Sequence, residues 1–400
     1  MGEGQGEGDE GDQILLSLIS TSVHSTTQSK TPLVWVLTDD RPGNTTQSVG
    51  LVRAIGWPYQ VKELHFTDTA RRIKFIWGPF AATNKGLDTA RSAPLTPPWP
   101  DVVIAAGWRP AQVSRWIRKQ SGGRTRLIQI GRKGGHVAGL FDIVITCSYF
   151  RLPPHPHRIE IAAPLTQVTP ERLAEATTRW QHLFATAPHP HVMLIVGGTT
   201  KRHQWTPDIA RHLGKDVQDF ALAAHGSVFA ITSRRTGAEA AAALAEDLGT
   251  TAAVHQWQPG QRENPYWAYL ACADVLVVTG ESESMLAEAS VLGKPVYIYP
   301  LPPSHQPLRF KARVKAWMKD WAVSHAGLHQ TWRQRLLSSI ATFSISSGFI
   351  RPRRDLNELH QALIRRGIAR FFGEPLAIWS PPSLREIDEV AMKVKKQLRY

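Results

Sequence analysis

The sequence predicts an α/β protein built from two Rossmann-like domains with parallel sheets. Short runs of β-branched apolar residues recur along the chain, and a helical pattern follows most of them. Strands of this kind, linked through helices, are typical of a parallel sheet covered on both faces. The clearest case is 273–299, where strand Val275–Val278 leads through a Gly turn and an amphipathic helix to strand Val296–Tyr299. The alternation begins again after a Pro-rich break before His191, which indicates a second domain.

The composition favours a globular protein of a reducing compartment. The 400 residues suffice for two domains with full cores, and 42% of them are hydrophobic. No apolar run approaches the roughly 20 residues that span a bilayer, and the N-terminus lacks a signal-peptide pattern. Cys147 and Cys272 lie in apolar contexts, so we expect buried thiols and no disulfide.

We expect five segments along the chain. The first is a disordered tail, because residues 1–13 carry five acids among glycines. In order, the segments are the acidic and polar tail (1–30), an N-terminal Rossmann-like domain (31–187), a second Rossmann-like domain (188–302), a basic amphipathic insertion (303–350) and C-terminal helices (351–400).

The remaining elements follow from the same patterns. The strands expected besides the two above cover residues 32–37, 61–66, 101–106, 127–130, 143–147, 192–196, 228–232 and 254–257. The expected helices cover 45–55, 111–117 (after a turn at 107–110), 168–187, 208–225, 238–248 and 264–271, with two more inside 356–399 separated by 372–382.

Three strand ends of the second domain carry small, hydroxylated or cationic residues. Because the carboxyl ends of parallel strands meet at one edge of a sheet, we expect these residues to converge there and to bind a diphosphate. They are Gly198, Thr199, Lys201, Ser233, Arg234, Arg235, Thr279, Ser282 and Ser284. Glu288, one helical turn below Ser284, is placed to offer a carboxylate to ribose hydroxyls. The alternative is a capped βαβ unit with a solvated Glu288.

The chain lacks GxGxxG and the P-loop pattern, so neither a dinucleotide enzyme nor an NTPase is supported. His155 with His157, and His189 with His191, invite a metal interpretation. Histidines spaced by a proline, without a nearby carboxylate or cysteine in the sequence, are more often loop residues, and we expect no metal.

The net charge of +14 concentrates near the C-terminus, where residues 301–400 hold 18 Lys and Arg against 7 Asp and Glu. Within 308–322, one helical face is apolar and the rest is basic, as in helices that lie flat on an anionic membrane. The apolar face consists of Phe310, Val314, Trp317, Met318 and Trp321. Residues 70–80 also mix basic and aromatic side chains. Helices packed on the protein body are the alternative for both segments, and nucleic-acid binding rests on charge alone.

Several motifs together resemble the mitochondrial-fission ELM-type (elongated mitochondria) family and its bacterial relatives. They are GNTTQ (43–47) with GLVRAIG (50–56), PDVVIAAGW (100–108), GGTTK (197–201), SRRT (233–236), NP (264–265), VTGESESM (278–285) through Glu288 and GKP (293–295), and RGIAR (366–370) with Trp379. They occur in the family's order and spacing over residues 32–398.

The resemblance implies a two-domain fold of the GT-B glycosyltransferase type, whose halves face each other across a cleft. It implies a nucleotide-sugar donor in the second half, and adds Gly197, Glu281 and Met285 to the expected donor-binding residues. The acceptor lies in the first half, where Asp40 is the nearest carboxylate for a base, with Asn44 and Gln47 as polar helpers; helix capping is the alternative for Asp40.

The function we expect is that of a membrane-associated glycosyltransferase that moves a sugar from a nucleoside-diphosphate sugar to a lipid or envelope-glycan acceptor. It would work in the cytoplasm, peripherally on the inner face of the membrane, without a cofactor and without nucleic acid. The alternative is a non-catalytic adaptor that recruits a membrane-remodelling partner.

Overall fold

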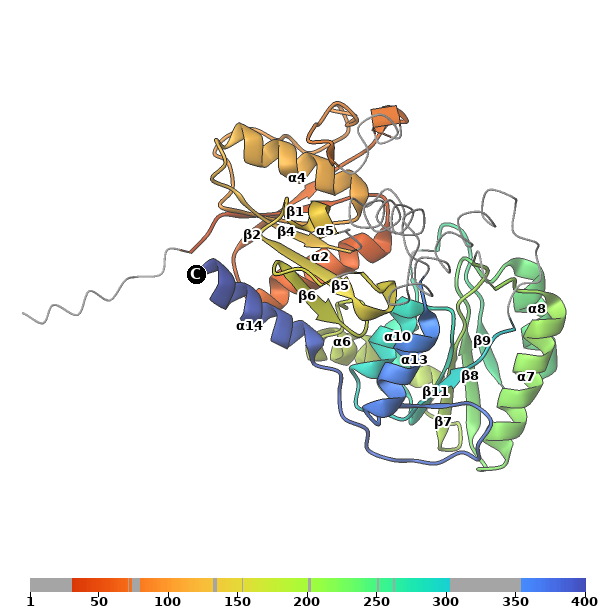
Figure 1. Ribbon diagram of the computed structural model, residues 1–400. Helices are drawn as coiled ribbons and strands as arrows, with labels where there is room; N and C mark the ends of the chain where they lie inside the picture. Colours follow the sequence, from red (N-terminus) through yellow and green to blue (C-terminus); the bar gives the residue numbers. More distant parts are fainter. Residues whose placement is uncertain are drawn as a thin grey trace, which may run out of the picture.

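The computed structural model describes residues 31–70, 72–73, 80–131, 135–152, 154–200, 203–249, 252–261, 263–302 and 354–400. Within these ranges the chain forms two parallel sheets of six strands each, flanked by helices (Figure 1). The prediction of an α/β protein with two Rossmann-like parallel-sheet domains of the GT-B type and C-terminal helices is therefore confirmed. The predicted tail (1–30) and basic insertion (303–350) lie outside the described residues.

The first sheet has the strand order β2-β1-β3-β4-β5-β6. Its strands are β1 (Val34–Thr38), β2 (Tyr59–Glu63), β3 (Val102–Ala106), β4 (Arg126–Ile130), β5 (Ile143–Cys147) and β6 (Arg158–Ile161). β1, β3 and β5 are buried along their whole length, because helices cover both faces of the sheet. β6 was not predicted, because it is a short edge strand without a continuous apolar run.

The helices of this domain are α2 (Pro42–Ile55), α4 (Trp108–Gln120), α5 (Gly135–Ala138) and the 3-10 turn η2 (Ser148–Phe150). α2 begins at Pro42, earlier than the predicted start at Thr45, because proline fits the first helical turn, where its missing N–H costs nothing. α2 packs on the sheet face that carries Val36, whereas α4 and α5 pack on the face that carries Leu37.

α6 (Pro170–Trp180) and the 3-10 turn η3 (Gln181–Leu183) link the two domains. The predicted helix 168–187 is thus shorter than expected, and Thr169 caps it by accepting the N–H of Arg172 at 3.3 Å.

The second sheet has the order β12-β11-β10-β7-β8-β9. Its strands are β7 (His191–Ile195), β8 (Ser227–Ile231), β9 (Ala253–His255), β10 (Val275–Thr279), β11 (Val296–Tyr299) and β12 (Ala369–Phe371).

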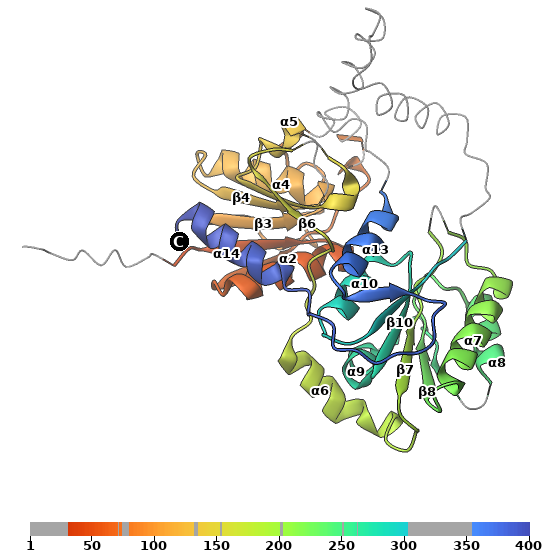
Figure 2. The same ribbon diagram turned by 60° about the horizontal axis from the view of Figure 1, so that its bottom comes forward.

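The helices of the second domain are α7 (Pro207–Leu222), α8 (Ala238–Leu248), α9 (Tyr266–Cys272), α10 (Glu283–Ser290) and α13 (Leu356–Arg365). α7 and α8 cover one face of the sheet, and α9, α10 and α13 cover the other. The final helix, α14 (Glu386–Leu398), lies instead on α2 of the first domain. The C-terminal segment therefore adds an unpredicted edge strand to the second sheet and then returns to the first domain (Figure 2).

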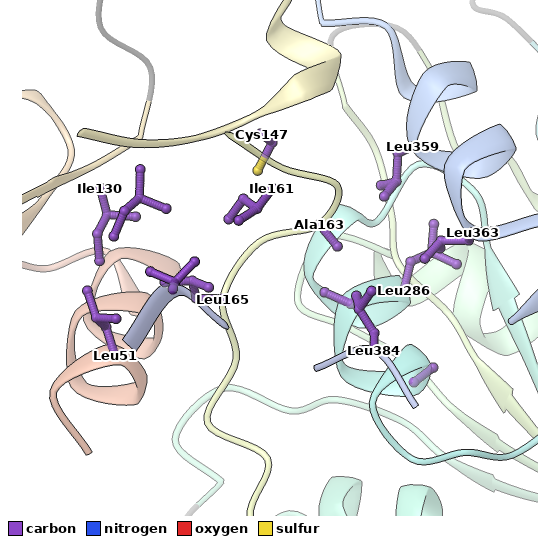
Figure 3. Close-up of a cluster of buried hydrophobic side chains, with 14 of the residues drawn as sticks. Leu51, Ile130, Cys147, Ile161, Ala163, Leu165, Leu286, Leu359, Leu363 and Leu384 are labelled. Atoms are coloured by element: carbon purple, nitrogen blue, oxygen red, sulfur yellow. The ribbon is translucent and has the colours of Figure 1, made fainter. Parts of the chain in front are cut away.

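A single hydrophobic cluster runs through both domains. Figure 3 shows it passing from Leu51 on α2 through Ile161 at the end of β6 and Leu165 in the connecting segment to Leu286 on α10 and Leu363 on α13. All five side chains are at most 4% exposed. Because the connecting segment is buried on both sides, the cluster holds the domains together through apolar packing as well as through the chain.

Candidate functional site

The three polar loops of the second domain form one cluster. They follow β7, β8 and β10, which are neighbouring parallel strands, so the loops meet at the carboxyl edge of the sheet. The carbonyl of Gly197 accepts hydrogen bonds from Ser233 Oγ at 2.6 Å and Thr236 Oγ1 at 2.5 Å. Gly198 N donates to Glu281 Oε1 at 2.6 Å. The expected convergence of these strand ends is thus present.

The two glycines allow the loops to approach this closely. A Cβ on Gly198 would lie 2.1 Å from the carbonyl carbon of Arg235, and one on Gly197 would lie 2.0 Å from Glu281 Oε1. Both contacts are far inside van der Waals distance, so any side chain would push the loops apart. The two glycines are therefore needed for the close packing of the loops. The N–H of Gly198 is not free to bind a phosphate, because it already donates to Glu281.

Glu281 lies at the centre of the cluster and is 4% exposed. Its Oε1 also accepts from Thr279 Oγ1 at 3.2 Å and lies 3.5 Å from Trp205 Nε1. Burial raises the pKa of this carboxyl, although the N–H and O–H groups pointing at it act in the opposite direction. Glu281 Oε2 and Ser282 Oγ are buried and have no hydrogen-bond partner among the described residues. A bound ligand would supply the partner that buried polar atoms usually have.

The other predicted hydroxyls hold the loops in shape. Thr279 Oγ1 accepts the N–H of Gly197 at 2.9 Å, and Thr199 Oγ1 accepts that of Trp205 at 3.2 Å. Arg234 and Arg235 are exposed at the rim of the cluster. Lys201 lies outside the described residues.

α10 begins at this cluster. Ser282 occupies its N-cap position but makes no side-chain capping bond, while Ser284 is exposed and Met285 packs against the core. Below the α10 start, His360 of α13 donates from Nε2 to the carbonyl of Gly280 at 2.7 Å. Burial lowers the pKa of His360, although this bond acts against the shift.

Glu288 points away from the loops toward α9 and α6. It is half-buried and accepts a hydrogen bond from Tyr266 Oη at 2.5 Å. Burial raises the pKa of Glu288 to about 7, although the Tyr266 bond and the charge of Arg172 lower it. The carboxyl predicted to meet a ribose therefore already has a tyrosine partner.

In the first domain, the carboxyl end of β1 carries two aspartates with different surroundings. Asp39, which sequence reasoning missed, is buried and accepts bonds from Asn44 Nδ2 and Arg109 Nη2, each at 3.0 Å. Asp40 is exposed and pairs with the same Arg109. Gln47 bonds within its own helix, to Gly43 O at 3.0 Å. The turn GWRP after β3 was the signal that could have pointed to Arg109.

The carboxyl edges of the two sheets meet directly. Tyr149, just after β5, donates from Oη to Glu283 Oε2 at 2.5 Å, and Arg354 pairs with the other oxygen of Glu283. Burial raises the pKa of Tyr149, and the nearby Cys147 and Glu283 add to that shift. The two sets of polar loops therefore face a common region between the domains.

The segment between the domains is held by α14. Glu386 at the start of α14 accepts the N–H groups of Ala162 and Ala163 at 2.7 and 3.1 Å. Its carboxylate also pairs with Arg366 at 3.0 Å.

No helix within the described ranges is long and apolar enough to cross a bilayer. The apolar face predicted for membrane contact (Phe310, Val314, Trp317, Met318 and Trp321) lies outside those ranges, as do most of residues 70–80.

Two doubly wound parallel sheets whose carboxyl edges meet around polar loops define a protein of the GT-B type. Within that class, the chain belongs to the mitochondrial fission ELM1 family, whose model matches residues 42–344. The resemblance expected from the sequence motifs is thereby confirmed.

Two relatives illustrate the family. The mitochondrial fission protein ELM1 of Arabidopsis thaliana is 30% identical over 221 residues, which cover 50% of this chain and 51% of the plant protein. The match thus spans about half the length of that relative. An uncharacterized protein of Rickettsia prowazekii (strain Madrid E) is 26% identical over 323 residues, covering 70% of this chain and 86% of the relative.

Among solved structures, a UDP-GlcNAc 2-epimerase from Methanocaldococcus jannaschii is similar, with a TM-score of 0.45 at 8% identity. The match covers 91% of this chain and 99% of that one. This likeness is too distant to indicate an activity.

Proposed function

We propose that the protein transfers a sugar from a nucleoside-diphosphate sugar to a lipid or envelope-glycan acceptor at a membrane surface. The observation that carries the proposal is the loop cluster around Glu281. It lies at the carboxyl edge of a parallel sheet, where such sheets bind ligands, and leaves Glu281 Oε2 and Ser282 Oγ buried without partners among the described residues.

The chemistry follows from the charges at this edge. In the transfer, an acceptor hydroxyl forms a bond to the anomeric carbon while the bond from that carbon to the diphosphate breaks. The departing diphosphate gains negative charge, which the N–H groups of the first turn of α10, left uncapped by Ser282, and the exposed Arg234 and Arg235 stabilise. This scheme needs no metal.

The acceptor side of the proposal places the proton-accepting group on the first domain. Asp40 is exposed at the carboxyl end of β1 and takes the proton of the acceptor hydroxyl. The buried Asp39 accepts hydrogen bonds from Asn44 and Arg109 and thereby fixes the positions of both side chains. The basic segment 308–322 supplies peripheral contact with the anionic inner face of the membrane.

The test is binding and turnover of a panel of nucleotide-sugars, measured by calorimetry and by release of the nucleoside diphosphate. Ser282→Ala removes the unpaired hydroxyl and should weaken binding about tenfold, the value of one hydrogen bond. Ser290→Ala is the matched control, because this buried hydroxyl at the other end of α10 donates to Leu286 O of its own helix at 2.6 Å. Equal affinities in both variants would contradict the proposed donor site.

The second candidate is a non-catalytic adaptor that recruits a membrane-remodelling partner. It is favoured by the description of the family, which names mitochondrial fission. An adaptor has no need of a diphosphate, so the absence of binding to every nucleotide-sugar and nucleoside diphosphate in the panel would favour it over the transferase.

A further inference from the structure

The amino-terminal edge of the second sheet, opposite the loop cluster, brings together two histidines and an aspartate. His191 is the first residue of β7 and is buried, His189 precedes it by two residues and is exposed, and Asp274 immediately precedes β10. β7 and β10 are neighbouring parallel strands, so residues at their amino ends lie side by side although they are distant in the sequence. The sequence showed no carboxylate near these histidines, and the fold supplies one.

Hydrogen bonds fix Asp274 and His191 in place. Asp274 Oδ2 accepts the backbone N–H of His191 at 2.7 Å, and the backbone N–H of Asp274 donates to His191 O at 3.0 Å. His189 Nδ1 lies 2.5 Å from the same Oδ2. The two imidazole rings stack with centroids 3.8 Å apart. The carboxylate thus faces both the strand start and the exposed ring.

The surroundings of His191 also select its tautomer. Its Nε2 lies 3.1 Å from the carbonyl of Ala187. A carbonyl only accepts, so this nitrogen carries the hydrogen and Nδ1 of the neutral ring keeps a lone pair. Histidines that bind metals commonly donate their other ring N–H to a backbone carbonyl in this way, which orients the ring.

We propose that His189, His191 and Asp274 bind one divalent transition-metal ion of the Zn²⁺ class. One ligand atom from each side chain lies within 4.8 Å of the other two, and this is the only such group of three among the described residues. A tetrahedral zinc ion with bonds of about 2.1 Å needs its ligand atoms about 3.4 Å apart. The exposed His189 side chain can rotate to adjust these distances when an ion binds.

The donor set selects the metal. Two imidazole nitrogens and one carboxylate oxygen suit zinc and its neighbours, whereas Mg²⁺ and Ca²⁺ prefer oxygen ligands throughout. Three protein ligands leave a fourth position for water. Because the site joins the starts of β7 and β10 at the edge opposite the loop cluster, the ion stabilises the second domain and takes no part in transfer.

The test is titration of the metal-free full-length protein with Zn²⁺ by calorimetry, and with Co²⁺ by visible absorption, which reports tetrahedral ligation. We expect one equivalent to bind and to raise the melting temperature, since the ion binds only the folded arrangement. His189→Ala should weaken Zn²⁺ binding about 100-fold and abolish the rise, and because the side chain is exposed the variant should fold. Asp274→Asn, which keeps an oxygen for the His191 N–H, should do the same.

The sequence offers a matched control. His155 and His157 form a second His-Pro-His motif, but no carboxylate completes a three-ligand group with them among the described residues. The double variant His155→Ala and His157→Ala should bind Zn²⁺ as the parent does. Undiminished affinity in His189→Ala, or a loss of the bound equivalent in the double control, would overturn the proposal. Neither readout depends on the transferase activity.

Discussion

Tyr149 of the first domain donates a hydrogen bond of 2.5 Å to Glu283 at the start of α10 in the second domain. This bond joins the ends of two strands that belong to different sheets, β5 and β10. It lies beside the loop cluster, so the position of the first domain and the start of α10 depend on each other.

Tyr149→Phe should destabilise the protein by about 1–3 kcal/mol, because it removes a hydrogen bond to a charged group and leaves Glu283 with Arg354 alone. Tyr299→Phe is the control, since Tyr299 donates to Asp216 at 2.7 Å within the second domain. Chemical unfolding gives both stabilities, and small-angle scattering gives the domain arrangement. A scattering change in the control as large as in Tyr149→Phe would contradict a special role for the Tyr149 bond.

Gly198→Ala should abolish nucleotide-sugar binding, because the new Cβ would lie 2.1 Å from the carbonyl carbon of Arg235 and would separate the loops after β7 and β8. Gly43→Ala is the control: it lies in α2 and meets nothing within 4 Å, so it should be neutral or stabilise by up to about 1 kcal/mol. Calorimetric titration and thermal unfolding measure both effects. Full binding by Gly198→Ala would show that the tight loop packing is dispensable.

Glu386→Gln should cost about 1–3 kcal/mol, because the carboxylate accepts two backbone N–H groups of the connecting segment and pairs with Arg366. Glutamine keeps one acceptor oxygen and loses the charge. Glu389→Gln, on the exposed side of the same helix, should change stability by less than about 0.5 kcal/mol. Urea unfolding of both variants tests this difference, and equal stabilities would refute it.

Glu288 should make stability depend on pH. Its pKa is raised from 4.5 to about 7 in the folded protein, mainly by burial, so the folded state binds the proton more tightly than the unfolded state does. The stabilisation is therefore complete below the unfolded pKa and is lost as pH rises through about 7, by about 3 kcal/mol in all. Unfolding free energies of the parent and of Glu288→Gln should diverge across this window. If the two unfolding free energies change in parallel with pH, the raised pKa of Glu288 is contradicted.

Trp317→Ala with Trp321→Ala should reduce binding to vesicles that contain anionic lipid, because tryptophans on the apolar face of a basic helix anchor it at the interface. Sedimentation with anionic and with neutral vesicles, at low and high salt, measures the effect. The parent should bind anionic vesicles more strongly and lose that preference at high salt. Equal binding of parent and variant would place the membrane contact elsewhere.

Local patterns of the sequence determined most of the secondary structure. Runs such as Val102–Ala106 and Val296–Tyr299 are continuous apolar stretches, and a chain can bury them only as strands covered on both faces. Because each such strand ends in a polar turn, the positions of the polar loops after β7, β8 and β10 also followed. β6 and β12 were missed, because charged residues interrupt the apolar run in these short edge strands.

The tertiary structure alone decided which polar groups meet. Asp39 and Asp40 are neighbours in the sequence, but the direction in which each leaves β1 buries the first against Asn44 and Arg109 and exposes the second. Glu288 faces Tyr266, and Asp274 faces His189, across distances in sequence that no local pattern spans. Apolar periodicity is a property of consecutive residues, whereas the partner of a buried charge is set by how whole strands and helices pack, and that packing exists only in the folded chain.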